Sequence, residues 1–369
     1  MRLSAGSSPA RGLLAAGLLA VVGLSAGPAS AEIKSFRDWT AACDNQRACS
    51  AYGFDADAVG GAYLRIERGG APDAAIRITV AVDVQDGGKF KLAFDDPAVA
   101  GLPGDAIAGA TNQDDELKRL QVFDPPAVAT LLASLRKAKK LIVTRIDPPG
   151  ATPSDPLTTA ISLDGYAAAM LWIDDQQKRV GTVTAAIRPG DKPAAAIPPL
   201  PAQPVVTAAK ATGGAKPDAK KVPAVVLAKA REVCDTTEHF TEAEDATRLD
   251  GGNVMYWFPC KEMSGAYNYF YALLVAAPGK PVRVADFKTP RELGGKDSDT
   301  IETNMNPSFD DASRTLVLFN KGRGMGDCGS FSEWVWDGAA FRMISSKDMS
   351  DCKGVPMSDW PTLFRAERK

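Results

Sequence analysis

The stretch PAAAIPPLP, residues 193–201, determines how we expect this chain to be organised. It lies in a longer segment, residues 189–223, that contains almost no large apolar side chain. Such a segment cannot bury enough surface to offset the entropy lost on ordering, and its prolines favour an extended chain. We therefore predict a Pro/Ala/Lys-rich linker at 189–223 between two domains, residues 32–188 and 224–369.

The first domain is predicted to mix strands and helices. Residues 76–82 alternate apolar and polar side chains, as in a strand with one buried face. Asp124 precedes two prolines and an apolar pattern of helical spacing, which predicts a helix that begins there. Further elements are expected as a strand over 89–94, a strand over 141–146 and a helix from Asp164 through Trp172.

The second domain is predicted to be rich in β-strands. Its short aromatic or β-branched runs are bounded by turn residues. The expected strands are 254–258, 269–275, 282–287, 316–319 and 333–336. Asp337 and Gly338 then form a hairpin-type pair before Phe341. The fold class that follows is α+β, with a mixed first domain joined to a β-rich, disulfide-stapled second domain.

Residues 1–31 have the pattern of a cleaved signal peptide. Arg2 and Arg11 give a basic start, residues 12–24 are apolar, and Ala29-Ser30-Ala31 supplies small residues for cleavage. The apolar run is too short to span a bilayer, and no other stretch is apolar enough to do so. We predict an exported, periplasmic protein with no transmembrane segment in the mature chain.

The charge of the chain excludes one class of partner. The formal net charge is -2, and it falls to -4 once the two arginines of the signal peptide are removed. Neither value gives the basic surface that nucleic-acid binding requires, so no nucleic acid is expected as a partner.

The six cysteines predict structural disulfides, because an even count in an exported chain is typical of a disulfide framework. Two of them fall in the first domain and four in the second, so pairing within domains leaves three arrangements. The simplest arrangement joins neighbours in sequence: Cys43–Cys49, Cys234–Cys260 and Cys328–Cys352.

Residues 324–329, GMGDCG, match a G-x-G-x-x-G pattern, but strand-like residues follow it where a dinucleotide site needs a helix. No cofactor is therefore expected. Two interpretations stay open for residues 322–329. One is a tight loop pinned by Cys328. The other is a binding loop in which Arg323 and Asp327 point outward and backbone N–H groups face an anion.

Aromatic residues form a second group of candidates. Tyr267, Tyr269 and Tyr271 share a face if they lie on a strand, and so do Trp334 and Trp336. Exposed rings would stack on sugars or on partner side chains, whereas buried rings would fill the β core. We expect the tyrosine ladder to be the more exposed of the two.

The chain has few groups suited to catalysis or to metal binding. His239 is its single histidine and lies among acidic residues, which indicates a surface position. The pairs Asp95-Asp96, Asp174-Asp175 and Asp310-Asp311 lack the spacing of a calcium loop and are best explained by turns and helix ends. No catalytic residue and no metal site is predicted.

Several segments together resemble the bacterial domain-of-unknown-function 1176 family. They are residues 36–45 with Cys49, 162–165, 171–177, 321–329, 334–338 and 360–363. The resemblance implies an exported protein of Gram-negative bacteria and carries over no catalytic residues. The first domain is also loosely similar to the invasion-associated locus B family, which would imply an envelope or host-interaction role.

Three functions are compatible with these features. The leading hypothesis is a non-catalytic module that binds an envelope component or a partner protein. The first alternative is an envelope hydrolase that uses carboxylates. The second is an inhibitor of a cell-wall-degrading enzyme, in which the disulfide-pinned loop enters the target's cleft.

Overall fold

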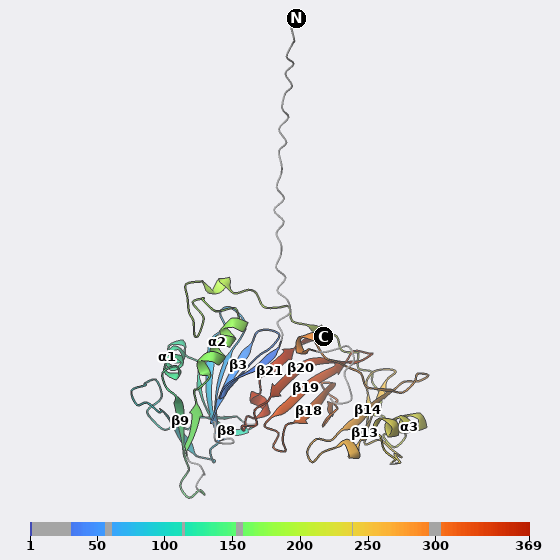
Figure 1. The fold of residues 1–369 in the computed structure, drawn as a ribbon. Helices are drawn as coiled ribbons and strands as arrows, with labels where there is room; N and C mark the ends of the chain where they lie inside the picture. The colour runs from blue at the N-terminus through green and yellow to red at the C-terminus, as the bar shows by residue number, and fades with distance from the viewer. Residues whose placement is uncertain (2–30, 56–60, 113–114, 153–157, 238, 295–303) are drawn as a thin grey trace.

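The structure is a computed structural model. It describes residues 1, 31–55, 61–112, 115–152, 158–237, 239–294 and 304–369 (Figure 1). The predicted signal peptide, residues 1–31, lies outside the described residues except for its two ends.

The N-terminal part is built on a seven-stranded antiparallel sheet. Its strand order is β1 (Glu32–Phe36), β2 (Trp39–Cys43), β3 (Cys49–Phe54), β4 (Ala62–Arg68), β5 (Ile76–Val82), β8 (Asp115–Val122) and β7 (Ala110–Asn112). A three-stranded sheet packs with it, in the order β10 (Thr158–Ser162), β9 (Lys140–Ile146) and β6 (Lys89–Phe94). The helices α1 (Pro125–Leu135) and α2 (Tyr166–Gln176) complete this part.

Local sequence signals explain both helices. The side chain of Asp124 accepts a hydrogen bond from the Ala127 N–H at 3.1 Å and so caps α1. Helix α2 begins after Gly165, whose carbonyl accepts from the Ala169 N–H at 2.9 Å. Both helices bury apolar side chains in the core that the two sheets share. The predicted helix 164–172 is therefore present but extends to Gln176.

The C-terminal part contains two further sheets and one helix, α3 (Ala224–Val233). One sheet has the order β12 (Asp245–Arg248), β13 (Val254–Pro259), β14 (Tyr271–Ala276) and β15 (Arg283–Val284). The other has the order β16 (Phe287–Lys288), β20 (Phe341–Met349), β19 (Gly329–Trp336), β18 (Thr315–Lys321) and β17 (Ser308–Asp310), with β21 (Thr362–Arg365) paired to β20. Strands therefore dominate a chain with three described α-helices, in agreement with a β-rich α+β fold. The expected strand 282–287 is replaced by the two short strands β15 and β16.

Strand β2 is covered on both faces of the seven-stranded sheet, and this is why all five of its residues are buried. Leu64 and Ile66 face the helices, whereas Tyr63, the neighbour of Leu64, faces the opposite way, because side chains alternate along a strand. On that second face Tyr52, Phe54 and Tyr63 pack with Cys328, Met349, Val355 and Trp360 of the C-terminal part. Figure 1 shows the order that results: helices, the sheet with β3, then β18–β21.

Residues 189–223 run extended along the surface and touch both parts. The Arg47 guanidinium donates to the carbonyls of Pro198 and Pro199 at 3.2 and 2.7 Å. Further along, β11 (Val205–Val206) pairs in parallel with β22 (Glu367–Arg368). Proline lacks an N–H but keeps its carbonyl, so a proline-rich segment can still accept such bonds. The division into two domains at this segment stays a prediction.

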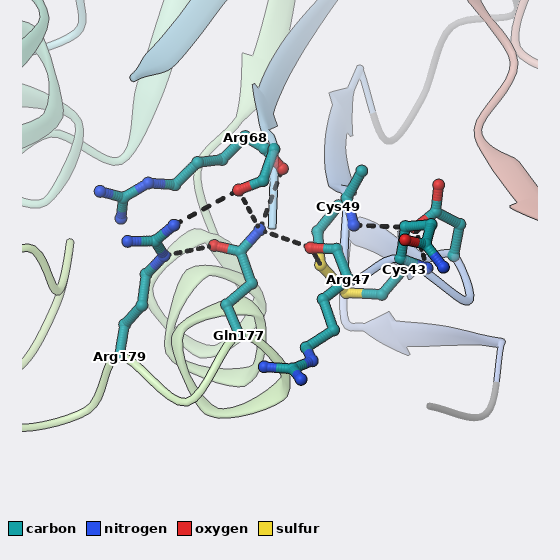
Figure 2. Close-up of a disulfide and its surroundings, with 10 residues drawn as sticks. Cys43, Arg47, Cys49, Arg68, Gln177 and Arg179 are labelled. Carbon is teal, nitrogen blue, oxygen red and sulfur yellow. Dashed lines mark hydrogen bonds between the residues drawn. A yellow bond between two sulfur atoms is a disulfide. The ribbon is translucent and has the colours of Figure 1, made fainter. Parts of the chain in front are cut away.

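Three disulfides are present, and they have the simplest of the expected pairings: Cys43–Cys49, Cys234–Cys260 and Cys328–Cys352. Beside the first disulfide, the Gln177 amide donates to the carbonyls of Arg47 and Arg68, and Arg179 donates to Gln177 (Figure 2). Burial, and then the charge of Arg179, lowers the pKa of Arg68 to about 10. This buried polar network ties the end of α2 to the hairpins of the sheet.

Two short segments far apart in the sequence meet where α2 begins. Trp39 donates its indole N–H to the Ser162 carbonyl at 2.9 Å, and Ser162 donates its hydroxyl to Asp38 at 2.6 Å. Gly165 lies under the same contact with a φ of 105°, and a Cβ there would lie 1.8 Å from the Phe36 carbonyl oxygen. Only glycine fits this position.

Replacing Gly165 with Ala should therefore lower the free energy of unfolding by more than about 3 kcal/mol, because backbone atoms would have to move. Gly181→Ala is the matched control, since Gly181 also has a positive φ, of 78°, but nothing within 4 Å of its Cβ position. That change should lose only about 1–2 kcal/mol. Urea denaturation measures both, and equal losses would show that the contact with Phe36 is unimportant.

Candidate functional site

The glycine-rich segment forms a β-hairpin loop between β18 and β19, which we call the hairpin loop (residues 322–328). The last paired residues are Lys321 and Gly329, and the Gly322 N–H donates to the Cys328 carbonyl at 2.8 Å. Gly329 has a φ of 128°, and a Cβ there would lie 2.0 Å from the Asn320 carbonyl oxygen. The glycine thus allows the tight closure, and a strand rather than a helix follows it, as expected.

Arg323 and Asp327 pair with each other across the hairpin loop. Arg323 Nε donates to Asp327 Oδ1 at 2.7 Å, and the Gly354 N–H donates to Asp327 Oδ2 at 2.7 Å. Burial alone would raise the pKa of Asp327, but these two partners lower it below its usual value. Asp327 is buried and does not point outward, whereas Arg323 is partly exposed. Their binding role stays a prediction.

The loop tip and two tyrosines are exposed beside each other. Met325 is 75% exposed, Tyr269 54% and Tyr267 37%. The Tyr267 hydroxyl lies 3.4 Å from the Gly322 carbonyl oxygen, and a Cβ on Gly324 would lie 3.7 Å from the Tyr267 ring. The structure therefore brings the predicted loop and two of the three predicted tyrosines together.

Two asparagines hold the tyrosine segment against the loop. Asn268 donates to the Lys321 carbonyl and accepts from its N–H, both at 2.9 Å. Asn306 donates to the Phe319 carbonyl at 2.8 Å and accepts from the Tyr269 N–H at 2.9 Å. These side chains take the place of strand pairing. Sequence reasoning did not identify them, because their partners are distant in the chain.

Tyr271 differs from the other two tyrosines. Tyr271 is the first residue of β14, whereas Tyr267 and Tyr269 precede the strand. The three tyrosines therefore do not form the expected ladder along one face of a strand. Tyr271 packs edge-on against Trp257 and donates to Glu244 at 2.8 Å. Burial, and then Glu244, raises its pKa to about 12. Trp334 and Trp336 are buried in the core.

The single histidine is exposed, and an aspartate of each predicted pair accepts hydrogen bonds from backbone N–H groups. His239 is exposed. Asp95 accepts from the N–H groups of Lys139 and Lys140, Asp174 from those of Ala186 and Ile187, and Asp310 from those of Ala312 and Ser313. Within the described ranges no group of three His, Cys, Asp or Glu residues could hold a metal ion, and no helix is long and apolar enough to cross a membrane.

The contact between the two parts depends on Asp359, which sequence reasoning did not single out. This buried carboxylate lies at the end of a 3-10 turn, η5 (Met357–Asp359). It pairs with Arg65 at 2.8 Å and Arg119 at 3.0 Å and accepts from the Tyr63 hydroxyl. The Tyr52 hydroxyl donates to its backbone carbonyl at 2.6 Å. All four partners lie on the second face of the seven-stranded sheet.

The chain belongs to the family described as "Protein of unknown function (DUF1176)", whose model matches residues 33–367. It is 28% identical over 359 residues to "Uncharacterized protein YpfG" of Escherichia coli (strain K12), covering 90% of this chain and 92% of that protein. A structure of invasion associated protein b from Bartonella henselae aligns at 17% identity and a TM-score of 0.28, over 40% of this chain and 99% of the other. That likeness is too weak to carry an argument.

Asp359→Asn should lower the free energy of unfolding by about 3–5 kcal/mol, because it leaves Arg65 and Arg119 buried without their carboxylate. Tyr63→Phe should lose about 1 kcal/mol, since it removes one hydrogen bond. Asp191→Asn, at an exposed position, is the control and should change stability by less than about 0.5 kcal/mol. An Asp359→Asn protein as stable as this control would show that the pairing is dispensable.

Asp348 of β20 gives a prediction on pH. Burial raises its pKa to about 6, from 3.8. The folded state then binds a proton more tightly than the unfolded state, so this group lowers stability as pH rises from about 4 through 6. Asp348→Asn should be more stable than the wild type by roughly 1–3 kcal/mol at pH 8 and similar to it at pH 4. Urea denaturation across this range tests it, and a difference independent of pH would contradict it.

Proposed function

We propose that this protein is an exported, periplasmic, non-catalytic module that binds a glycan of the cell envelope. The observation that carries the proposal is the exposed pair Tyr267 and Tyr269 beside the hairpin loop. Arg323 and Met325 extend the same surface. Asp327 and Tyr271 act as supports, because they hold Arg323 and the start of β14 in place.

A sugar fits this surface for physical reasons. Tyrosine offers an apolar ring face with a polar edge, which suits the mixed apolar and hydroxyl surface of a pyranose. Asn268 and Asn306 already hold the tyrosine segment, and the Cys328–Cys352 disulfide already holds the hairpin loop beside it. Little conformational entropy would therefore be lost on binding.

Export is supported by the pattern of residues 1–31 and by the three disulfides. Disulfides persist in oxidising compartments such as the periplasm and are rare in the cytosol. The non-catalytic assignment is supported by the carboxylate nearest the loop tip, Asp327. Its oxygens are engaged by Arg323 and Gly354, which leaves it poorly suited to transfer protons.

A second candidate function uses the same surface. Met325 protrudes from a loop that a disulfide and an ion pair hold in place, as in proteins that insert a rigid loop into an enzyme's cleft. This favours an inhibitor of a cell-wall-degrading enzyme as the alternative.

Co-sedimentation with isolated Gram-negative sacculi tests the glycan proposal. Tyr267→Ala and Tyr269→Ala should each reduce the affinity about fivefold, since each stacking ring is worth about 1 kcal/mol. Tyr267→Phe should keep most of the binding, because the ring remains and only a 3.4 Å hydrogen bond is lost.

Phe123→Ala is the matched control, because Phe123 is 49% exposed before α1, away from the hairpin loop. Its binding should equal that of the wild type. If the wild type does not sediment with sacculi, the glycan proposal is wrong. Loss of lysozyme activity when the protein is added, and its recovery with Met325→Glu, would then assign the loop to inhibition.

A further inference from the structure

A polar pocket lies between the second face of the seven-stranded sheet and the C-terminal strands β20 and β21. Its volume is about 360 Å³. The lining includes five basic side chains, and the only acidic one among the described residues there is Glu67. The basic residues come from both parts of the chain: Arg65, Arg68, Arg77, Lys347 and Arg365.

The carboxylates around the pocket balance only part of these charges. Arg365 Nε lies 2.6 Å from Asp44 Oδ2, and the Arg68 guanidinium is engaged by the Thr184 carbonyl and lies 4.0 Å from Asp174. Glu67 is shared between Arg65, at 2.9 Å, and Arg77, at 3.8 Å. Asp359 is likewise shared between Arg65 and Arg119. Because the whole chain carries a net negative charge, this excess of cations is a local feature of the pocket.

Two cations keep donors available to a ligand. Lys347 Nζ lies 3.3 Å from the Met357 carbonyl oxygen and forms no ion pair within the described part of the chain. Arg77 is 58% exposed and reaches Glu67 only at 3.8 Å.

We propose that this pocket binds the phosphoryl group of a small, polar phosphate ester. Guanidinium groups match phosphate oxygens through paired N–H donors, and Lys347 would add a compact positive charge. A doubly charged phosphoryl group suits several cations better than a single carboxylate does. The pocket exceeds the size of phosphate alone, and Ser50 and Thr362 place hydroxyl groups in its wall for the rest of the molecule.

The position of the pocket gives binding a structural consequence. Arg65 and Arg77 belong to the N-terminal sheet, whereas Lys347 belongs to the C-terminal sheet. A ligand that contacts both sides would bridge the two parts and stabilise their contact. The proposal concerns a site separate from the hairpin loop and does not depend on the glycan-binding function.

The test is calorimetric titration of the full mature protein with glycerol 3-phosphate and with glycerol, together with melting curves. Glycerol 3-phosphate should bind and raise the Tm by several degrees, whereas glycerol should do neither. Lys347→Gln and Arg77→Gln should each weaken binding at least tenfold, because each removes a charged donor. Lys347→Arg should retain most of the affinity.

Lys137→Gln, at an exposed lysine after α1, is the control and should bind as the wild type does. Equal responses to glycerol 3-phosphate and to sodium chloride of the same ionic strength would overturn the proposal, and so would unchanged affinity in both pocket variants. Vesicles that contain phosphatidic acid identify the source of the phosphoryl group. Binding to these vesicles but not to glycerol 3-phosphate would assign the site to a lipid headgroup, and binding to neither would overturn it.

Discussion

The burial of one carboxylate, that of Asp359, joins the two parts of this protein. It accepts from Tyr63 and pairs with Arg65 and Arg119, while Tyr52 donates to the backbone of the same residue. A buried charge is tolerated only when it is paired and hydrogen-bonded, so these partners must all be present in one arrangement. The contact therefore both attaches the turn η5 to the sheet and fixes its orientation.

The position of the turn determines what becomes of the second face of the sheet. Near β3 and β4 the face is covered by Met349, Val355 and Trp360, and it forms an apolar core with them. Further along the strands the cover ends, and Arg65 and Arg77 line the polar pocket instead. One face of the sheet thus provides both the apolar contact between the two parts and the basic residues of the neighbouring pocket.

The hairpin loop is held by the segment that leads into the turn at Asp359. Asp327 accepts from the Gly354 N–H, and Cys328 is bonded to Cys352, so the loop is anchored to the segment that leads into the turn at Asp359. Asn268 and Asn306 then hold the tyrosine segment to the base of the loop. The exposed aromatic surface is therefore supported by contacts from three separate segments of the chain.

Local patterns predicted much of the fold because their physical causes are local. The alternation over 76–82 and the cap at Asp124 depend only on neighbouring residues, and the strand and the helix are both present. The strand was expected to bury one face, but Thr79 and Ala81 on its other face are buried as well, because the C-terminal part covers that face. The structure has the simplest of the three disulfide arrangements that the sequence left open, in which each cysteine pairs with its neighbour in sequence. The expected tyrosine ladder does not form, because residues 267–269 precede β14 and are held by two asparagine side chains and a backbone hydrogen bond from Asn306 to Tyr269.

The sequence alone indicated an α+β fold rich in strands, three disulfides and the position of the glycine-rich loop, since each depends on composition or on short spacing. The pairing of the four cysteines in the C-terminal part was decided by the tertiary structure. Only the tertiary structure decided that Asp327 turns inward to Arg323 and Gly354 and that Asp359 is buried among four residues of a distant sheet. It also decided that five basic residues, which no sequence pattern marked, line one pocket. These features require contacts between segments that lie up to about 300 residues apart, and no local periodicity encodes which surface will face which.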